Sequence, residues 1–149
     1  TTRTTRTRRV GMKPQAYKRE VHYYECDGMG ITHHSNYIRF MEEARIDFLD
    51  QIGFPMDVIE AGGVVSPVVG INCQYKNMSY FKDVLCIKVF IKEYSGVRFS
   101  IGYEMSDKKT GQLRAVGESS HCFITKEGKI VMLRKVMPEL DQALKEYMS

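Results

Sequence analysis

The sequence has no hydrophobic run long enough to cross a membrane. Its 149 residues are 43% hydrophobic and 27% charged, and no apolar stretch approaches the roughly 20 residues that a spanning helix needs. The arginine-rich start is not followed by the apolar segment of a secretory signal. We therefore expect a cytoplasmic protein with no membrane partner, folded as one globular domain.

Closely spaced cysteines are also missing. The four cysteines are widely separated and form no C-x-x-C pair, which argues against a disulfide framework. A zinc site on His22, Cys26, His33 and His34 has suitable ligand types but matches no familiar spacing. We expect reduced cysteines, no metal and no other cofactor.

Excess basic charge is absent outside the first nine residues. The formal net charge is +4, and Arg3, Arg6, Arg8 and Arg9 lie in that stretch with no acid among them. Without these four, 18 basic residues face 18 acidic ones. Because nothing else suggests a base-reading element, we expect no nucleic-acid partner. Residues 1–11 are predicted to be a disordered tail or an expression remnant, followed by a single domain over residues 12–149.

Hydrophobic periodicity predicts an early strand followed by a long helix. Residues 17–26 alternate in polarity and are rich in aromatic and β-branched side chains, which indicates a strand. Apolar residues recur at spacings of three and four from Tyr37 to Ile52, which indicates a helix, with Ser35 or Asn36 as its N-cap. A short second helix is expected over residues 55–60.

The second half of the chain is predicted to form antiparallel strands. Four segments alternate with period two, namely residues 64–75, 84–94, 97–105 and 113–125. Turn residues between the last three segments predict hairpins. The small residues Ala115, Gly117 and Ser119 predict a place where a helix approaches the sheet closely. With a final helix from Pro138, this order indicates an α+β domain, an antiparallel sheet of about five strands wrapped around one long helix.

Ionisable side chains concentrate between the early strand and the long helix. Asp27 and His34 lie seven residues apart and are separated by a turn that contains Gly28 and Gly30. The first N–H groups of a helix lack intrahelical partners and carry the positive end of its dipole, so they stabilise developing negative charge. Asp27 and His34 are therefore candidates to face one reacting carbon.

The stretch YYECDGMGITHHSNY, from Tyr23 to Tyr37, followed by IRFMEEARIDFL, resembles the signature of hotdog-fold acyl-CoA thioesterases of the 4-hydroxybenzoyl-CoA thioesterase-like family. The resemblance implies a hotdog fold and hydrolysis of acyl-CoA to a carboxylic acid and free CoA. It implies that Asp27 is the catalytic carboxylate, as nucleophile or general base. It also implies that His34 and nearby N–H groups polarise the carbonyl, that Tyr23 lines the site, and that subunits form homodimers or homotetramers with sites at their interface.

The substrate-binding residues follow from these expectations. We place the acyl pocket between helix and sheet, with Val68, Val69 and Tyr37 as lining residues and Gly30 in the turn beside the substrate. Two alternatives remain open. One is an acyl-CoA sensor without turnover whose arginine-rich arm contacts nucleic acid, and the other is an acyl-carrier-protein thioesterase or a hydratase on the same fold.

Overall fold

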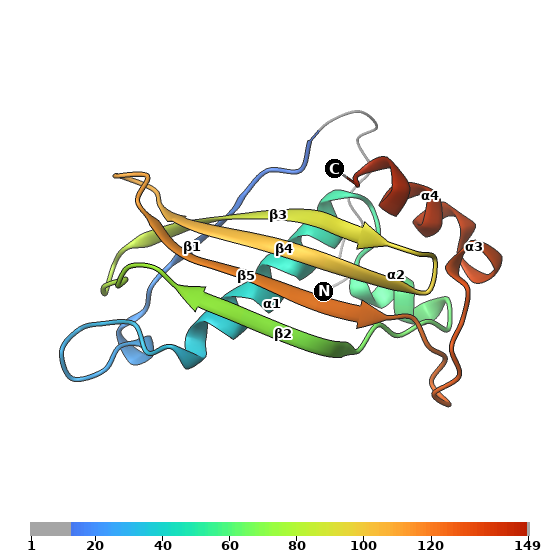
Figure 1. Ribbon diagram of the computed structural model, residues 1–149, viewed down its shortest axis with the longest axis horizontal. Helices are drawn as coiled ribbons and strands as arrows, with labels where there is room; N and C mark the ends of the chain where they lie inside the picture. The colour runs from blue at the N-terminus through green and yellow to red at the C-terminus, as the bar shows by residue number, and fades with distance from the viewer. Residues whose placement is uncertain (1–12, 149) are drawn as a thin grey trace, which may run out of the picture.

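The computed structural model describes residues 13–148, which form one antiparallel sheet with a long helix across one face and short helices at one end (Figure 1). The strands are β1 (Tyr17–Glu20), β2 (Val68–Tyr75), β3 (Val84–Tyr94), β4 (Arg98–Asp107) and β5 (Leu113–Cys122). The helices are η1 (Tyr23–Glu25), α1 (Ser35–Gln51), α2 (Met56–Ala61), α3 (Leu133–Val136) and α4 (Pro138–Glu146). Within residues 13–148, no helix is both long and apolar enough to span a membrane. The predicted tail, residues 1–11, lies outside the described residues.

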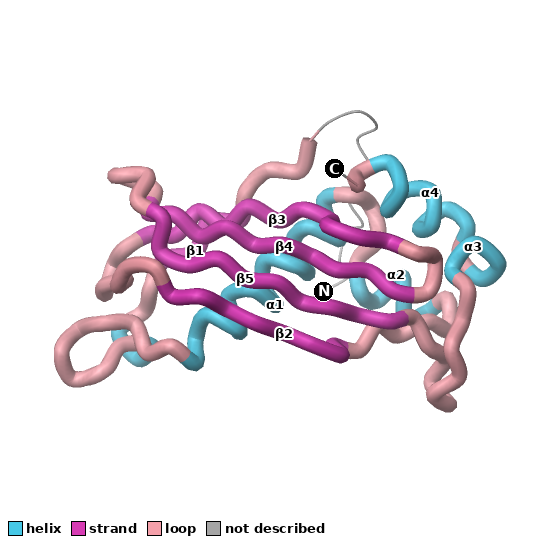
Figure 2. Tube along the Cα trace, in the orientation of Figure 1, coloured by secondary structure: helices cyan, strands magenta, loops and turns pink. Residues whose placement is uncertain are grey.

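The sheet has the strand order β1-β3-β4-β5-β2, and each neighbouring pair is antiparallel. The predicted hairpins are confirmed, since β3 pairs with β4 and β4 pairs with β5. Gly96 and Gly111 take φ values of +93° and +75° in the two turns, which few other residues tolerate. Figure 2 shows β3, β4, β5 and β2 side by side, and the strand order places β1 and β2 at the two edges of the sheet. The predicted α+β architecture is therefore confirmed.

The first strand is shorter than its alternation predicted. Residues 17–26 were expected to be extended throughout, but β1 ends at Glu20 and the 3₁₀ helix η1 follows. Glu25, at the end of η1, is buried and its Oε2 accepts a hydrogen bond from Arg19 Nη2 at 2.6 Å. A carboxylate can be buried only with such a partner, so the chain turns to bring Glu25 to Arg19.

The later strands agree with the predicted segments except near their ends. β3 spans the predicted residues 84–94. β2 begins only at Val68, because the preceding Pro67 has no N–H to donate to a sheet. β5 ends at Cys122 rather than at residue 125.

Helix α1 covers one face of the sheet (Figure 1). Its buried apolar residues are those of the predicted stripe, namely Tyr37, Phe40, Met41, Ala44, Phe48 and Leu49. Alternate residues of β4 face the helix and are also buried, namely Phe99, Ile101, Tyr103 and Met105. Complete burial of one such side chain contributes roughly 1.5–3 kcal/mol. The core therefore lies between α1 and the central strands.

Gly117 allows α1 and β5 to approach closely. A Cβ atom at this position would lie 2.8 Å from Met41 Cε and 2.9 Å from the carbonyl oxygen of Asn72. Both distances are shorter than van der Waals contact, and the second atom belongs to the backbone of β2. The predicted close approach at the row of small residues is confirmed at this position.

Candidate active site

Asp27 lies in a tight loop between η1 and α1. Cys26 and Thr32 form an isolated antiparallel bridge that closes the loop, and Gly30 takes a φ of +76° within it. Asp27 Oδ1 accepts hydrogen bonds from the N–H groups of Met29 at 2.8 Å and Ile31 at 3.3 Å. The side chain is exposed, and Oδ2 makes no hydrogen bond to any of residues 13–148. The loop therefore holds one carboxylate oxygen and presents the other.

The N-terminus of α1 differs from the prediction. Neither Ser35 nor Asn36 is the N-cap. His34 occupies that position, and the Ser35 N–H donates to His33 Nδ1 at 3.3 Å. Asn36 is buried, and its Nδ2 donates to the Glu25 carbonyl oxygen at 2.9 Å, so it holds η1 instead of capping the helix. The His34 N–H has no hydrogen-bond partner in the described part of the chain. This N–H can therefore donate to a bound group.

Aromatic side chains surround the start of α1. The ring centroids of His33 and His34 are 4.3 Å apart, and the Tyr75 hydroxyl donates to the His34 carbonyl oxygen at 3.4 Å. Tyr37 is buried, and its ring centroid lies 5.2 Å from that of Tyr75. Burial raises the pKa of the Tyr37 phenol. Tyr37 is thus a core residue that supports the helix N-terminus.

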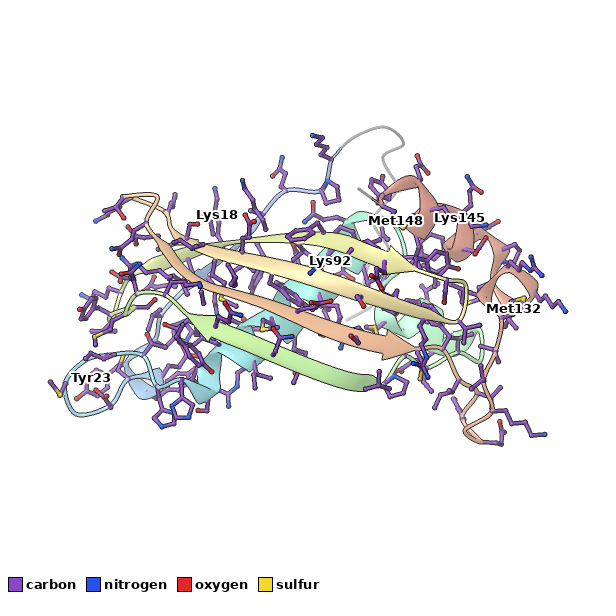
Figure 3. The ribbon with its side chains drawn as sticks, in the orientation of Figure 1. Lys18, Tyr23, Lys92, Met132, Lys145 and Met148 are labelled. Atoms are coloured by element: carbon purple, nitrogen blue, oxygen red, sulfur yellow. The ribbon has the colours of Figure 1, made fainter. Side chains whose placement is uncertain are left out.

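The structure does not bring all predicted site residues together within one chain. Tyr23, labelled in Figure 3, is 77% exposed. Its ring packs edge-on against Phe81, with ring centroids 5.5 Å apart. Asp27 and His34 make no direct contact within residues 13–148, so a substrate or water would have to lie between them. Val68 begins β2, and the strand carries it about 23 Å away from Tyr75 at the other end.

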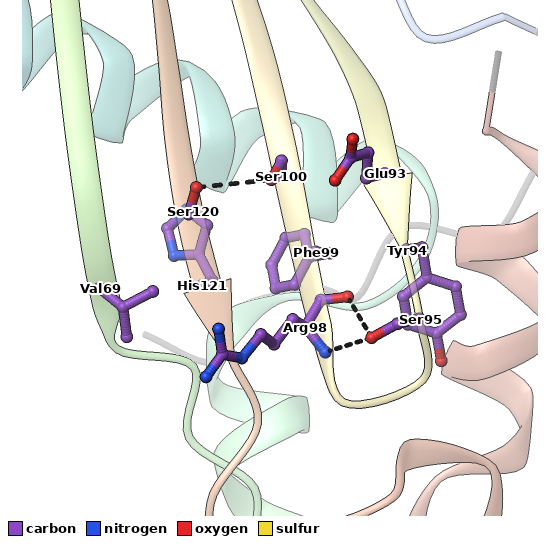
Figure 4. Close-up of a pocket in the computed structure, with 9 residues that line it drawn as sticks. All are labelled: Val69, Glu93, Tyr94, Ser95, Arg98, Phe99, Ser100, Ser120 and His121. Atoms are coloured by element: carbon purple, nitrogen blue, oxygen red, sulfur yellow. Dashed lines mark hydrogen bonds between the residues drawn. The ribbon is translucent and has the colours of Figure 1, made fainter.

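Val69 lines a hollow of about 500 Å³ on the sheet face opposite α1 (Figure 4). The other lining residues are Glu93, Tyr94, Ser95, Arg98, Phe99, Ser100, Ser120 and His121. Ser100 and Ser120 face each other across the strands with their hydroxyl oxygens 3.4 Å apart. This hollow is therefore separate from the pocket expected between helix and sheet.

Two of the four residues with ligand types suited to zinc are engaged in other contacts. His22 Nδ1 lies 2.9 Å from the Tyr24 hydroxyl, and His33 Nδ1 lies 2.8 Å from Ser35 Oγ. In residues 13–148, no three His, Cys, Asp or Glu side chains are grouped as metal ligands.

A set of ion pairs beside the loop was missed by sequence reasoning. Arg19 donates to Glu25 through Nη1 at 2.8 Å and Nη2 at 2.6 Å, and to Glu43 through Nε at 2.8 Å. Burial opposes the charge on Arg19, but the hydrogen bonds to Glu43 and Glu25 outweigh it and raise its pKa. The sequence did contain one indication of these ion pairs. Arg19 and Glu25 are both an even number of residues from the buried Val21, so the alternation places them on the same, buried side.

A second missed polar group lies under α1. His121 Nε2 lies 2.8 Å from Ser119 Oγ, which lies 2.8 Å from the Tyr103 hydroxyl. Burial, together with the charge of Arg45, lowers the pKa of His121 to about 4. The imidazole is therefore neutral near pH 7, and it stacks on Phe99 as part of the core.

Known proteins share both this sequence and this fold. Residues 21–146 match the family described as the thioesterase-like superfamily. YneP of Bacillus subtilis, provisionally named an acyl-CoA thioesterase, is 36% identical over 121 residues, which cover 80% of this chain and 87% of YneP. The 4-hydroxybenzoyl-CoA thioesterase of a Pseudomonas species is 28% identical over 97 residues, 63% of this chain and 69% of that protein. The crystal structure of the DHNA-CoA thioesterase from Staphylococcus aureus aligns with a TM-score of 0.83 at 28% identity, covering 89% of each chain.

The five-stranded sheet, its long helix and these relatives define a thioesterase of the hotdog fold. The chain belongs to the thioesterase-like superfamily. The resemblance found in residues 23–37 and the predicted fold are both confirmed.

Proposed function

We propose that this chain is an acyl-CoA thioesterase that releases a carboxylic acid and free CoA, with Asp27 as its catalytic carboxylate. The observation that carries the proposal is an exposed carboxylate, fixed by two backbone N–H groups, on the loop that leads into the open N-terminus of α1. The names of its relatives support an acyl-CoA substrate. We assign no metal or redox cofactor, because a carboxylate and N–H donors can supply this chemistry. We place the enzyme in the cytoplasm.

The reaction needs stabilisation of an oxyanion. Attack on the thioester carbon moves negative charge onto the carbonyl oxygen, and one preorganised N–H donor stabilises that charge by roughly 3 kcal/mol. The His34 N–H, at the positive end of the α1 dipole, is the candidate donor. The CoA thiolate then leaves with the electrons of the C–S bond.

Two routes use the same carboxylate. If Asp27 attacks directly, it forms a mixed anhydride with the acyl group, which water hydrolyses in a second step. If Asp27 acts as a general base, it removes a proton from the water that attacks the thioester. We assign His34 and Tyr23 supporting roles at the site and Gly30 a place beside the substrate, while Tyr37 contributes to substrate binding from the core, by supporting the helix N-terminus.

We also propose that the enzyme is a homodimer, or a homotetramer built from such dimers. The edge strand β2 exposes four large hydrophobic side chains, namely Val68, Val69, Ile71 and Tyr75. An uncovered edge also presents unpaired backbone groups that invite another strand. Sedimentation velocity should give about twice the chain mass or a multiple of it; a monomer would contradict the proposal.

Pairing of two β2 strands would complete the site. An antiparallel two-fold register centred between Ile71 and Asn72 would set the partner subunit's Val68 opposite Tyr75. Because Tyr75 contacts His34, the predicted lining residues Val68 and Val69 would then reach the helix N-terminus of the other copy. This would reconcile their predicted role with their position in one chain.

A thiol-release assay tests the proposed activity. We expect at least one of a panel of short, long, branched and aromatic acyl-CoAs to be hydrolysed with kcat/KM above about 10⁴ M⁻¹s⁻¹. The same acyl groups on acyl carrier protein should be poorer substrates, and removal of residues 1–9 should leave turnover unchanged. If no acyl-CoA released thiol, the sensor alternative would replace this proposal.

A further inference from the structure

We propose that Arg19 is a positioning residue, which fixes the catalytic loop relative to the N-terminus of α1 by binding Glu25 and Glu43 together. The inference rests on the proposed function, which makes Asp27 and the His34 N–H the reacting groups. Nothing in the sequence motif assigns a role to Arg19, which lies eight residues before Asp27.

The guanidinium group of Arg19 joins three segments of the chain. From β1 it makes two parallel bonds to the Glu25 carboxylate, at 2.8 and 2.6 Å, and a third bond to Glu43 of α1, at 2.8 Å. Its Nη1 also donates to the Glu20 carbonyl oxygen at 2.6 Å, and its Cζ atom lies 4.8 Å from the Phe40 ring centroid. With a longer bond of 3.4 Å from Nη2 to Glu43 Oε2, all five donors of the rigid fork are used, and a lysine ammonium cannot reproduce these contacts.

Glu25 transmits this fixed position to the site. Its carboxylate is held by Arg19, and its backbone carbonyl oxygen accepts the His33 N–H at 2.8 Å and Asn36 Nδ2 at 2.9 Å. Asp27 follows two residues later, across the Cys26–Thr32 bridge. A displaced Glu25 would therefore disturb both the carboxylate loop and the first turn of α1.

A contribution to folding stability does not by itself explain why the ion pairs of Arg19 with Glu25 and Glu43 are present. A buried ion pair commonly contributes no more than well-packed apolar residues of the same volume, whereas it does fix geometry through directional bonds. Glu43 is itself held from a second side, since the Tyr17 hydroxyl donates to its Oε1 at 2.9 Å. Burial and that bond raise the pKa of Tyr17 to about 12. The Glu43 carboxylate, which accepts the Arg19 bond on α1, is thus held in place by Tyr17 as well.

Arg19→Lys is the test variant, with Asp141→Asn as its matched control. Asp141 is a buried carboxylate on α4 that binds Tyr94 and Lys145 at the opposite end of the sheet (Figure 1). We expect Arg19→Lys to lower kcat by about 10- to 100-fold with KM within about twofold, while the control keeps wild-type kcat in its folded fraction. Hydrogen exchange should accelerate at the amides of Asp27 and His33 only in Arg19→Lys.

A double variant separates positioning from general damage. In the Asp27→Asn background, Arg19→Lys should cause no further loss of turnover, because its effect acts through the carboxylate. If Arg19→Lys does not fold, Glu43→Gln, which keeps the bidentate pair with Glu25, should give an intermediate kcat. Wild-type kcat and wild-type exchange in Arg19→Lys would overturn the positioning role. Full turnover in Asp27→Asn would instead overturn the proposed function, and the exchange data would still report on Arg19.

Discussion

Asp27→Asn is expected to lower kcat by about 10³-fold, close to 4 kcal/mol of transition-state stabilisation. An amide can neither attack the thioester carbon nor remove a proton from water. The amide oxygen can still accept the N–H bonds from Met29 and Ile31 that the Asp27 Oδ1 accepts now. The variant therefore removes the chemistry and leaves the loop in place. Steady-state thiol release on the best acyl-CoA gives the measurement.

Two comparisons make the result specific to the carboxylate. Asp57→Asn, which changes an exposed carboxylate at the start of α2, should keep wild-type kcat. Asp27→Ala should lose both the chemistry and the loop acceptor, so its amide exchange in residues 27–31 should exceed that of Asp27→Asn. Near-normal turnover in Asp27→Asn would show that another group carries the reaction.

Gly117→Val is expected to lower the free energy of unfolding by about 3 kcal/mol. The new Cβ would meet Met41 Cε at 2.8 Å and the backbone oxygen of Asn72 at 2.9 Å. The methionine side chain can move, but the β2 backbone oxygen cannot move without disturbing its pairing with β5. Urea unfolding followed by circular dichroism measures the loss.

Gly102→Val is the matched variant on the opposite face of the sheet. A Cβ at Gly102 would lie 2.3 Å from Phe90 Cε2, which is nominally a worse contact. That atom is the far end of a half-buried side chain, so the ring can turn aside and the expected loss is only about 1 kcal/mol. Equal losses in the two variants would contradict the close helix contact at Gly117.

Much of the fold could be predicted from local sequence pattern. The residues 84–94 and the stripe from Tyr37 to Ile52 predicted β3 and α1 closely, because a period of two or of 3.6 depends on neighbouring residues. The alternation at residues 17–26 is also a local pattern, and its prediction of a strand over the whole segment was wrong. It contains no information about Glu25 finding a buried partner, and that contact ends β1 early.

For the candidate site, the sequence by itself determined which loop is the candidate and which groups on it are chemically able to act, since Asp27, the glycine turn and His34 lie within one short motif. Only the tertiary structure decided how that loop is held. Arg19 and Glu43 are 24 residues apart and come together because β1 and α1 pack on each other. It also decided that Asn36 binds η1 instead of capping its helix. A buried polar group needs a hydrogen-bond partner, which can come from a distant part of the chain. The local periodicity of the sequence does not show which residue that partner is.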